Sequence, residues 1–335
     1  MPTLLLSEAI ASRYRRDIAT LTGAAWRIAV AAPDLSDAQL EDVRIAFLSS
    51  DVLGGSTRDV HEPSMQIFCD LLLRAPGLAW LQVPSAGVDR PVYQALAGRG
   101  VAITTAAGAA SETVALSALT GLLALSRRLP LWVEAKRTRT WLNLRSGPGE
   151  PRELRGEKVL IVGCGRIGSH LARLCQALGM RTHGLRRSPA AAAAPFDAMG
   201  TLDELGDAVA TADWVVAACP LTPQTRGLFS DAVLRRFAPH ASFINIARGG
   251  VVDEAALIDA LRSGRMEAAY LDVFEVEPLP AASPLWELPN VLLSPHSAGD
   301  TRGRHARIAE IFLANLKRWL HGQALDNLVS LDAQH

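Results

Sequence analysis

The stretch "EKVLIVGCGRIGSHLARLCQALG" (residues 157–179) decides the fold. Its branched apolar run at 159–162 predicts a buried strand that leads directly into a Gly-x-Gly-x-x-Gly pattern and then into an amphipathic helix. In such a unit the first glycine permits a tight turn, the second lets the backbone approach a pyrophosphate, and the third lets helix and strand pack closely. The helix N-terminus then offers N–H groups to the phosphates. A purely structural turn is the alternative, but we expect a dinucleotide to contact Gly163, Gly165, Arg166, Ile167 and Gly168.

The next predicted strand ends in "GLRRSP" (184–189), at a point where such units usually carry Asp or Glu to hold a ribose hydroxyl. Arg186, Arg187 and Ser188 stand there instead. A carboxylate would repel a 2′-phosphate, whereas guanidinium groups bind phosphate through charge-assisted hydrogen bonds. The segment therefore favours NADP(H), with NAD(H) as the second candidate cofactor. Two solvated arginines on a loop are the alternative.

Apolar runs bounded by turn residues alternate with helical stretches along most of the chain. This alternation predicts parallel sheets joined by crossover helices. The segment "PAAAAAPF" (189–196) is low in complexity and indicates a surface loop or a short helix. We expect helices at 167–178, 228–237 and 254–263, and strands at 3–7, 45–50, 78–83, 101–105, 158–163, 181–185, 214–219, 242–247, 268–273 and 291–294.

Composition excludes several classes of protein. The 335 residues are 49% hydrophobic and 20% charged, which is typical of a globular, well-packed protein. Lys plus Arg and Asp plus Glu both total 34, so no bulk charge favours a nucleic acid or an anionic membrane surface as a partner. The apolar stretch 113–126 is too short to span a membrane, and the N-terminus lacks the pattern of a secretory signal. The four cysteines show no metal-binding or redox spacing, so we expect no metal and a reducing, cytoplasmic compartment.

Beyond the glycine-rich unit, the chain carries further motifs in a fixed order. They are "SAGVD" (85–89), "CPLTPQTRGLF" (219–229), "FINIARGGVVDEAAL" (243–257), "LDVFEVEPLP" (271–280) and "SPHSAG" (294–299). Together they resemble the D-isomer-specific 2-hydroxyacid dehydrogenases, in particular the glyoxylate/hydroxypyruvate reductase branch of that family. The resemblance runs from residue 81 to residue 301, and the first 75 residues fit the family only in their strand–helix alternation.

The resemblance implies an active site that reduces a 2-keto acid. Arg248 is similar in position to the arginine that binds the substrate carboxylate and polarises its carbonyl, and His296 to the acid/base histidine. Glu277 matches the carboxylate that pairs with this histidine and favours its protonated form. Glu275 is a near neighbour that spacing alone does not exclude. Each residue taken alone fits a surface charge or a structural role more readily, and only their joint occurrence in family order points to catalysis.

The resemblance also implies contacts around the substrate and the cofactor. The backbone of the loop that receives the substrate carboxylate corresponds to Ser85, Ala86, Gly87 and Val88. Ser111 and Asp272 correspond to positions near the nicotinamide. Backbone positions that line the cofactor correspond to Cys219, Pro220 and Ile246. We interpret Cys164 and Cys219 as small packing residues rather than nucleophiles.

Two segments depart from the family pattern. Where the family often has an apolar residue and Ala-Thr after the histidine, the chain has Ser297 and Asp300-Thr301, which puts the substrate specificity in doubt. Leu116 and Ser117 stand where an acidic residue and a histidine are usual, and we expect this change to affect packing rather than chemistry.

The resemblance implies an α/β fold of two Rossmann-like or flavodoxin-like domains with parallel sheets, the nucleotide domain being inserted into the substrate domain. We expect the substrate-binding domain at 1–102 plus 299–335 and the dinucleotide-binding Rossmann domain at 103–298, with the active site between them. The helix at 113–126 and the arm around Trp141 resemble the family's dimer contact, which predicts a homodimer. Trp141 as part of the core or as a surface anchor is the alternative.

The sequence therefore predicts an NADPH-preferring oxidoreductase that reduces small 2-keto acids, of the glyoxylate or hydroxypyruvate type, to D-2-hydroxy acids. Two alternatives stay open. One is a dinucleotide-dependent, corepressor-like binding protein of the same fold, and the other is an NAD-dependent D-2-hydroxyacid dehydrogenase such as a phosphoglycerate dehydrogenase. The sequence does not name the keto acid.

Overall fold

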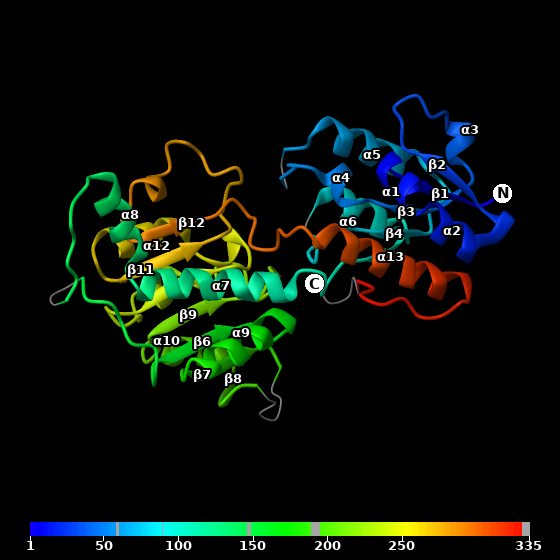
Figure 1. Cartoon of the computed structure of the whole chain (residues 1–335). Coiled ribbons are helices and arrows are strands. Elements are labelled where there is room, and N and C mark those ends of the chain that lie inside the picture. The colour runs from blue at the N-terminus through cyan, green and yellow to red at the C-terminus, as the bar shows by residue number, and fades with distance from the viewer. Residues whose placement is uncertain (58–59, 89, 146–148, 189–194, 330–335) are drawn as a thin grey trace. The chain divides into compact units, whose positions relative to one another are not determined.

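A computed structural model describes residues 1–57, 60–88, 90–145, 149–188 and 195–329 (Figure 1). The chain divides into two compact units, Met1–Ala109 with Thr301–His335 and, inserted between these parts, Ala110–Asp300. The first crossing was expected near residue 102 and lies later. Residues 103–109 belong to the first unit. Thr105 N–H donates to the carbonyl of Asn327 at 3.1 Å, and the carbonyl of Ala109 accepts from Arg307 Nε at 2.6 Å.

The first unit is a five-stranded parallel sheet of order β2-β1-β3-β4-β5, the order of flavodoxin-like folds. Its strands are β1 (Thr3–Leu6), β2 (Arg27–Val30), β3 (Val43–Phe47), β4 (Trp80–Gln82) and β5 (Ala102–Thr104). Its helices are α1 (Glu8–Arg13), α2 (Arg15–Thr22), α3 (Asp37–Leu40), α4 (Ser50–Leu53), α5 (Pro63–Arg74), α6 (Pro91–Gly98) and α13 (Arg304–Leu320).

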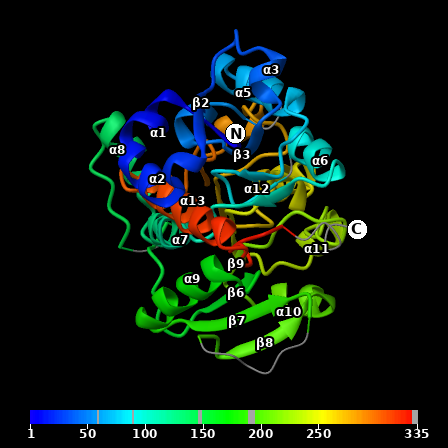
Figure 2. The ribbon, with the colours of Figure 1, turned by 90° about the vertical axis from the view of Figure 1, so that its right-hand side faces the viewer.

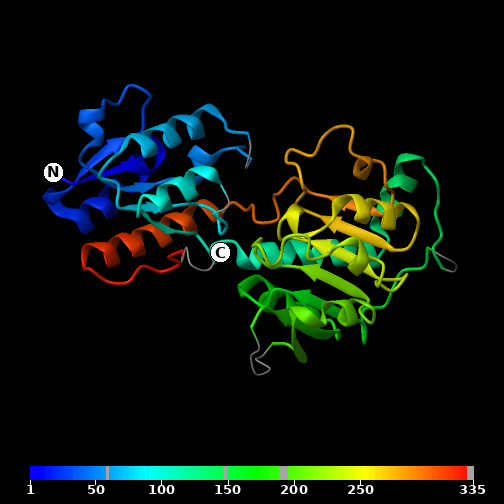
Figure 3. The ribbon, with the colours of Figure 1, turned by 180° about the vertical axis from the view of Figure 1, so that it is seen from behind.

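The late helix α13 packs on a face of this first sheet (Figure 3). Phe312 stacks on Phe47 at 4.4 Å between ring centroids and on Trp80 at 5.6 Å, and Trp319 stacks on Trp80 at 5.6 Å. Offset aromatic stacking of this kind adds to the burial of the rings themselves. Residues distant in sequence therefore form one core.

The second unit is a seven-stranded parallel sheet of order β12-β11-β10-β9-β6-β7-β8. Counted within the unit, this is the doubly wound order of dinucleotide-binding sheets with one more strand at the edge. The strands are β6 (Lys158–Val162), β7 (Arg181–Arg186), β8 (Ala198–Thr201), β9 (Trp214–Ala217), β10 (Ser242–Asn245), β11 (Ala268–Leu271) and β12 (Val291–Leu293). The helices are α7 (Ser111–Ser126), α8 (Leu129–Arg137), α9 (Arg166–Ala177), α10 (Leu205–Val209), α11 (Asp231–Leu234) and α12 (Glu254–Arg262).

Every strand expected from the sequence is present, but two further strands, β2 and β8, were missed. Both lie at the edge of their sheets, as Figure 2 shows for β8 beside β7. Both are exposed or only partly buried along their length. An edge strand needs no continuous apolar run, so hydrophobic periodicity does not reveal it.

Helix α7 covers one face of the second sheet. Its buried residues include Ala115, Ala118 and Leu122, and a Cβ on Gly121 would lie 2.2 Å from the ring of Tyr270 in β11. The absence of a side chain there lets the helix approach the sheet closely. In the described part of the chain no single helix is long and apolar enough to cross a membrane; α7 and α8 reach that length and composition only as a pair bent by 66°.

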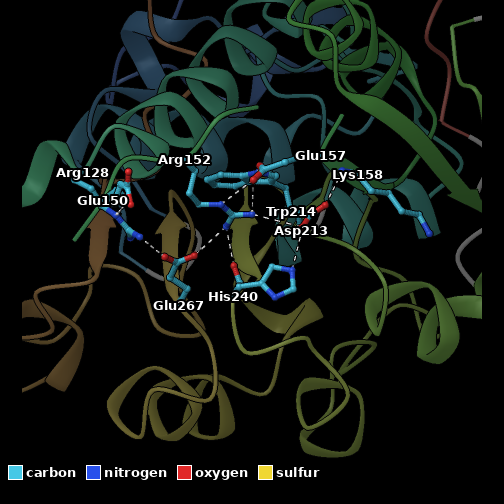
Figure 4. Close-up of polar contacts among 9 residues, drawn as sticks. All are labelled: Arg128, Glu150, Arg152, Glu157, Lys158, Asp213, Trp214, His240 and Glu267. Carbon is cyan, nitrogen blue, oxygen red and sulfur yellow. Dashed lines mark hydrogen bonds and ion pairs between the residues drawn. The ribbon is translucent and has the colours of Figure 1, made fainter. Parts of the chain in front are cut away.

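A network of charged side chains lies at the amino ends of the strands of the second sheet (Figure 4). Arg152 contacts Glu157 at 3.0 Å, Glu267 at 2.9 Å and Asp213 at 3.7 Å. Its guanidinium also lies 4.7 Å from the ring centroid of Trp214, whose indole N–H donates to Glu157. Buried charges of this kind are tolerated because each has a partner of opposite sign.

The network extends to both sides of Arg152. Arg128, at the turn between α7 and α8, binds the other oxygen of Glu267. Asp213 accepts the backbone N–H of Lys158 at 2.7 Å and contacts His240 Nε2 at 3.0 Å. The segment that leads into β6 is thereby tied to the first residues of the central strands.

Candidate active site

The strands of the second sheet are all parallel, so their carboxyl ends lie along one side of the sheet, which we call its carboxyl edge. With the exception of Ser111 and the loop 85–88, the predicted site residues lie at this edge. Each follows or ends a strand: Gly163–Gly168 after β6, Arg186–Ser188 at β7, Cys219 and Pro220 after β9, Ile246 and Arg248 after β10, Asp272 and Glu277 after β11, and His296 after β12.

The glycine-rich loop has the geometry that a pyrophosphate requires. Gly163 has a φ of 112°, and a Cβ there would lie 2.5 Å from the backbone of Ala218, which follows β9. This contact lies where the strand order reverses, between β6 and β9. A Cβ on Gly168 would lie 2.1 Å from the carbonyl oxygen of Gly163. Only glycine fits at both positions.

The N-terminus of α9 faces this loop. Gly165 occupies the N-cap and is exposed, a Cβ built on it would meet no atom within 4 Å, and no side chain in the described part of the chain caps the helix there. The first N–H groups of a helix need an external acceptor, and an anion supplies one. Arg166 and Ile167 begin the same helix. The residues present therefore fit a dinucleotide phosphate.

Arg186 is the last residue of β7, and Arg187 and Ser188 follow it; all three are exposed. Cys164 lies close enough to Arg186 for the two to interact. Burial raises the pKa of the Cys164 thiol to about 11, although the positive charge of Arg186 opposes the shift. The thiol is therefore protonated at neutral pH, which fits a packing role. Most of the low-complexity segment, residues 189–194, lies outside the described residues.

His296 and Glu277 form a hydrogen-bonded pair. Nδ1 of His296 lies 2.7 Å from Oε2 of Glu277, and Oε1 of Glu277 accepts the backbone N–H of Phe274 at 3.0 Å. A carboxylate accepts only, so Nδ1 carries the proton and Nε2 is the nitrogen that can face a substrate. The Glu277 side chain is 16% exposed and the His296 side chain 44%. The pair is thus anchored at the carboxylate and open at the ring.

The surroundings keep Glu277 ionised. Burial by itself would raise the pKa of this carboxyl, but the hydrogen bonds from His296 and Phe274 and the positive charges of His296 and Arg248 outweigh it. The pKa of Glu277 therefore lies below its ordinary value of 4.5. An ionised Glu277 stabilises a protonated imidazole beside it.

Arg248 lies next to this pair because two backbone segments pack tightly. Its half-buried side chain donates from Nη1 to the carbonyl of Ala247 at 2.7 Å. The neighbouring residue, Gly249, has its Cα so close to the loop after β11 that a Cβ would lie 1.9 Å from the backbone of Phe274. The glycine in "ARGG" thus brings the Arg248 loop against the loop that carries Glu277.

Three polar groups at this edge were not foreseen in their roles. Glu254, in the first turn of α12, accepts the backbone N–H of Glu275 at 2.9 Å. Burial and the nearby charges of Glu275 and Glu277 raise its pKa, although the hydrogen bond from Glu275 opposes the shift. Ser294 and Tyr270 contact each other at 2.8 Å. Their spacing in the sequence gives no signal, since only the folded chain brings them together.

The remaining predicted residues are placed as follows. Ser111 is the first residue of α7 and is buried, and Ile246 and Cys219 are buried beside the sheet edge. Ser85–Val88 belong to the first unit, where they follow β4. Ser85 Oγ donates to the carbonyl of Gly87 at 2.6 Å, and its own carbonyl accepts from Ala106 at 3.0 Å. Ser117, expected to affect packing only, donates to the carbonyl of Ala298 at 2.8 Å and so contacts the loop after His296.

Comparison with known proteins identifies the family. Residues 119–298 match the model of the D-isomer specific 2-hydroxyacid dehydrogenase NAD-binding domain. The chain is 34% identical over 270 residues to a glyoxylate reductase of Aeropyrum pernix, covering 79% of this chain and 80% of that protein. It is 34% identical over 301 residues to glyoxylate/hydroxypyruvate reductase B of Citrobacter koseri, covering 89% and 90%.

Solved structures give the same answer. A D-isomer specific 2-hydroxyacid dehydrogenase from Xanthobacter autotrophicus, in complex with NADPH and MES, superposes with a TM-score of 0.77 at 30% identity, over 100% of this chain and 99% of that one. The matched segment contains the whole glycine-rich unit and the Arg248, Glu277 and His296 loops. The chain is therefore an NAD(P)-dependent oxidoreductase and belongs to the D-isomer-specific 2-hydroxyacid dehydrogenase family.

Proposed function

We propose that the chain is an NADPH-preferring reductase of small 2-keto acids, of the glyoxylate or hydroxypyruvate type, which it converts to D-2-hydroxy acids. The observation that carries the proposal is the His296–Glu277 hydrogen bond of 2.7 Å beside Arg248, at the same sheet edge as the glycine-rich loop. A carboxylate binder, a proton donor and a dinucleotide loop are the groups that reduction of a keto acid requires.

Each residue has a separate task in the reaction. Arg248 binds the substrate carboxylate and polarises the C2 carbonyl. Bound NADPH supplies a hydride to C2. His296 gives the proton on Nε2 to the carbonyl oxygen, and Glu277 stabilises the imidazolium before that transfer. Solvent then returns a proton to the exposed ring, so that one keto acid, one NADPH and one proton yield one hydroxy acid and NADP⁺.

The preference for NADPH rests on the end of β7. Arg186, Arg187 and Ser188 are exposed there and offer two guanidinium groups and a hydroxyl to a 2′-phosphate. No carboxylate occupies these three positions to hold a ribose hydroxyl. The NADPH complex of the Xanthobacter relative supports the same cofactor. Ser111, Cys219, Pro220, Ile246 and Asp272 would line the rest of the dinucleotide.

We also infer a homodimer in a reducing, cytoplasmic compartment. Large apolar side chains are exposed on α7, α8 and the arm that follows, including Leu116, Trp132, Val133 and Trp141, the last with 97% of its surface exposed. Several large exposed apolar residues on consecutive segments favour an interaction surface there, and Trp141 is not part of the core of its own chain. All four cysteines are free thiols, as a reducing compartment requires.

The test is a substrate panel of glyoxylate, hydroxypyruvate, pyruvate and phenylpyruvate, each assayed with NADPH and with NADH. We expect turnover of at least one small keto acid and a higher kcat/KM with NADPH. A higher kcat/KM with NADH would overturn the cofactor preference. Tight NADPH binding without turnover of any keto acid would favour the corepressor-like alternative.

A further inference from the structure

The hydroxyl groups of Tyr270 and Ser294 lie next to the loops that follow β11 and β12. Tyr270 in β11 and Asp272 just after it point to the same side because they are two residues apart on one extended segment. Ser294 follows the neighbouring strand β12, and its Oγ lies 2.8 Å from Tyr270 Oη and 2.6 Å from Oδ1 of Asp272. Tyr270 and Asp272 are buried, at 8% and 3% exposure.

The chain of hydrogen bonds has one direction. A serine hydroxyl has one hydrogen, and the buried carboxylate of Asp272 can only accept it. Ser294 therefore donates to Asp272, and Tyr270 donates to Ser294. Burial raises the pKa of Tyr270, so its hydroxyl is protonated and able to donate throughout the neutral range. Hydrogen bonds in such a chain polarise and strengthen one another.

Asp272 in turn holds the backbone turn that carries His296. Its Oδ1 also accepts the N–H groups of Ser297 at 2.9 Å and Ala298 at 3.0 Å. Its backbone carbonyl accepts the N–H of His296 at 2.7 Å. His296 itself has a φ of 51°, in the left-handed region. Such a conformation costs a non-glycine residue about 1–2 kcal/mol, so the surrounding bonds must impose it.

The position of Tyr270 is fixed from the other side. A Cβ on Gly121 of α7 would lie 2.2 Å from one atom of the Tyr270 ring and 2.4 Å from another, so helix and ring are in direct contact. A ring held between a helix and its own strand has little freedom to turn its hydroxyl away from Ser294. The direction of the whole chain is therefore set by packing in the core.

We propose that Tyr270 and Ser294 are positioning residues for the reduction: they orient the Asp272 carboxylate, which holds the left-handed turn that brings His296 to Glu277. The proposal rests on the catalytic role of His296 proposed above. Neither hydroxyl needs to touch substrate or cofactor, because each acts through the backbone of the 294–298 loop.

The experiment compares Ser294→Ala, Ser294→Thr and Tyr270→Phe with the wild-type enzyme. The matched control is Ser126→Ala, which removes a serine hydroxyl that donates to the Leu123 carbonyl at the far end of α7. Three quantities are measured for each variant: kcat with hydroxypyruvate and NADPH, the Kd for NADPH by fluorescence, and the solvent exchange of the imidazole proton shared with Glu277, by NMR of ¹⁵N-histidine-labelled protein. The resonance of His296 is identified by its absence from His296→Ala.

We expect Ser294→Ala to lower kcat roughly tenfold to a hundredfold, as small misplacements of a reacting group do, while the Kd for NADPH changes less than about twofold. Exchange of the His296 proton should become faster. Tyr270→Phe should also lower kcat and speed proton exchange, but by less than Ser294→Ala. Ser294→Thr should have nearly the kcat and the proton exchange rate of the wild type. Ser126→Ala should change neither quantity.

Unchanged proton exchange and unchanged kcat in Ser294→Ala would overturn the proposal, as would a loss that Ser294→Thr fails to restore. The proton readout does not depend on turnover. If the wild-type enzyme reduces no keto acid but the exchange rates follow the expected order, the proposed function is wrong and the positioning of His296 stands. If the enzyme turns over and Ser294→Ala changes nothing, only the positioning is wrong.

Discussion

The second sheet has one polar cluster at the amino ends of its strands and another at their carboxyl ends, and the two clusters differ in composition and exposure. At the amino-terminal edge, Arg152 is 13% exposed and has three carboxylates and a tryptophan ring as partners (Figure 4). At the carboxyl edge, His296 has one carboxylate partner, a left-handed backbone and a ring that is 44% exposed. The charge of Arg152 is balanced by carboxylates of the same chain, whereas the ring of His296 is accessible to a substrate.

Ion pairs between basic and acidic side chains are present in both clusters, but we expect those around Arg152 to affect folding and the pair of His296 and Glu277 to affect catalysis. A buried guanidinium surrounded by carboxylates is costly to remove, because the buried carboxylates then lose a partner of opposite charge. An imidazole whose Nδ1 is fixed by a carboxylate has Nε2 available for a substrate. Substitutions in the two clusters should therefore separate activity from stability.

The largest effect is expected at the carboxyl edge. His296→Ala removes the proposed proton donor, so kcat should fall about 10²- to 10⁴-fold, which is the usual contribution of a general acid. The Kd for NADPH and the melting temperature should change little, because the side chain is half exposed and makes one side-chain hydrogen bond in the described part of the chain. Steady-state kinetics, fluorescence titration and thermal unfolding check this, and retained turnover would remove the acid role from His296.

The opposite pattern is expected at the amino-terminal edge. Arg152→Met removes the guanidinium that Glu157, Glu267 and Asp213 share, although Glu267 keeps its contact with Arg128, and should destabilise the protein by about 3 kcal/mol. The kcat of the protein that stays folded should not change. Denaturant unfolding and kinetics at low temperature measure the two effects.

The control for this variant is Arg235→Met. It removes an exposed ion pair with Asp231, one helical turn away, which should hardly affect stability. A loss of kcat in Arg152→Met, with the melting temperature unchanged, would contradict the structural role of the network.

A third variant tests specificity rather than rate or stability. Arg186→Asp replaces the cation that we propose binds the 2′-phosphate with a carboxylate that repels this phosphate and can accept from a ribose hydroxyl. The ratio of kcat/KM for NADPH over NADH should fall roughly tenfold to a hundredfold, as expected for one or two charge-assisted hydrogen bonds. Arg181→Asp, at the other end of β7, is the matched control. An unchanged ratio in Arg186→Asp would remove the 2′-phosphate assignment from this residue.

The smallest effect concerns acid stability. The pKa of Glu277 is lowered in the folded protein, so this carboxylate adds stability above its ordinary pKa of 4.5, and that stability is lost as the pH falls through the lower folded value. Glu277→Gln should therefore be less stable than the wild type at pH 6, and the difference should shrink at pH 3. Urea unfolding at both values measures it. A difference that grows toward low pH would show that the sign is wrong.

Much of the fold and of the site could be predicted from the sequence because both depend on local patterns. Val159–Val162 and the glycines that follow show their strand and turn directly, and Arg248, Glu277 and His296 lie in recognisable motifs. What could not be predicted depends on contacts between distant segments. Ser294 shows its hydrogen bonds to Tyr270 and Asp272 only when β11 and β12 are paired, and the edge strands β2 and β8 have no buried apolar run.

We propose above that a 2-keto acid receives a hydride at C2 and a proton at its carbonyl oxygen, at the carboxyl ends of the strands of the second sheet. The most direct measurement is reduction of hydroxypyruvate with NADPH that carries deuterium at C4 of the nicotinamide, followed by NMR and chiral analysis of the product. We predict deuterium at C2 of a product with the D configuration, and formation of this labelled product at least about a hundredfold slower with His296→Ala. Product of the L configuration, or label transfer undiminished in His296→Ala, would contradict it.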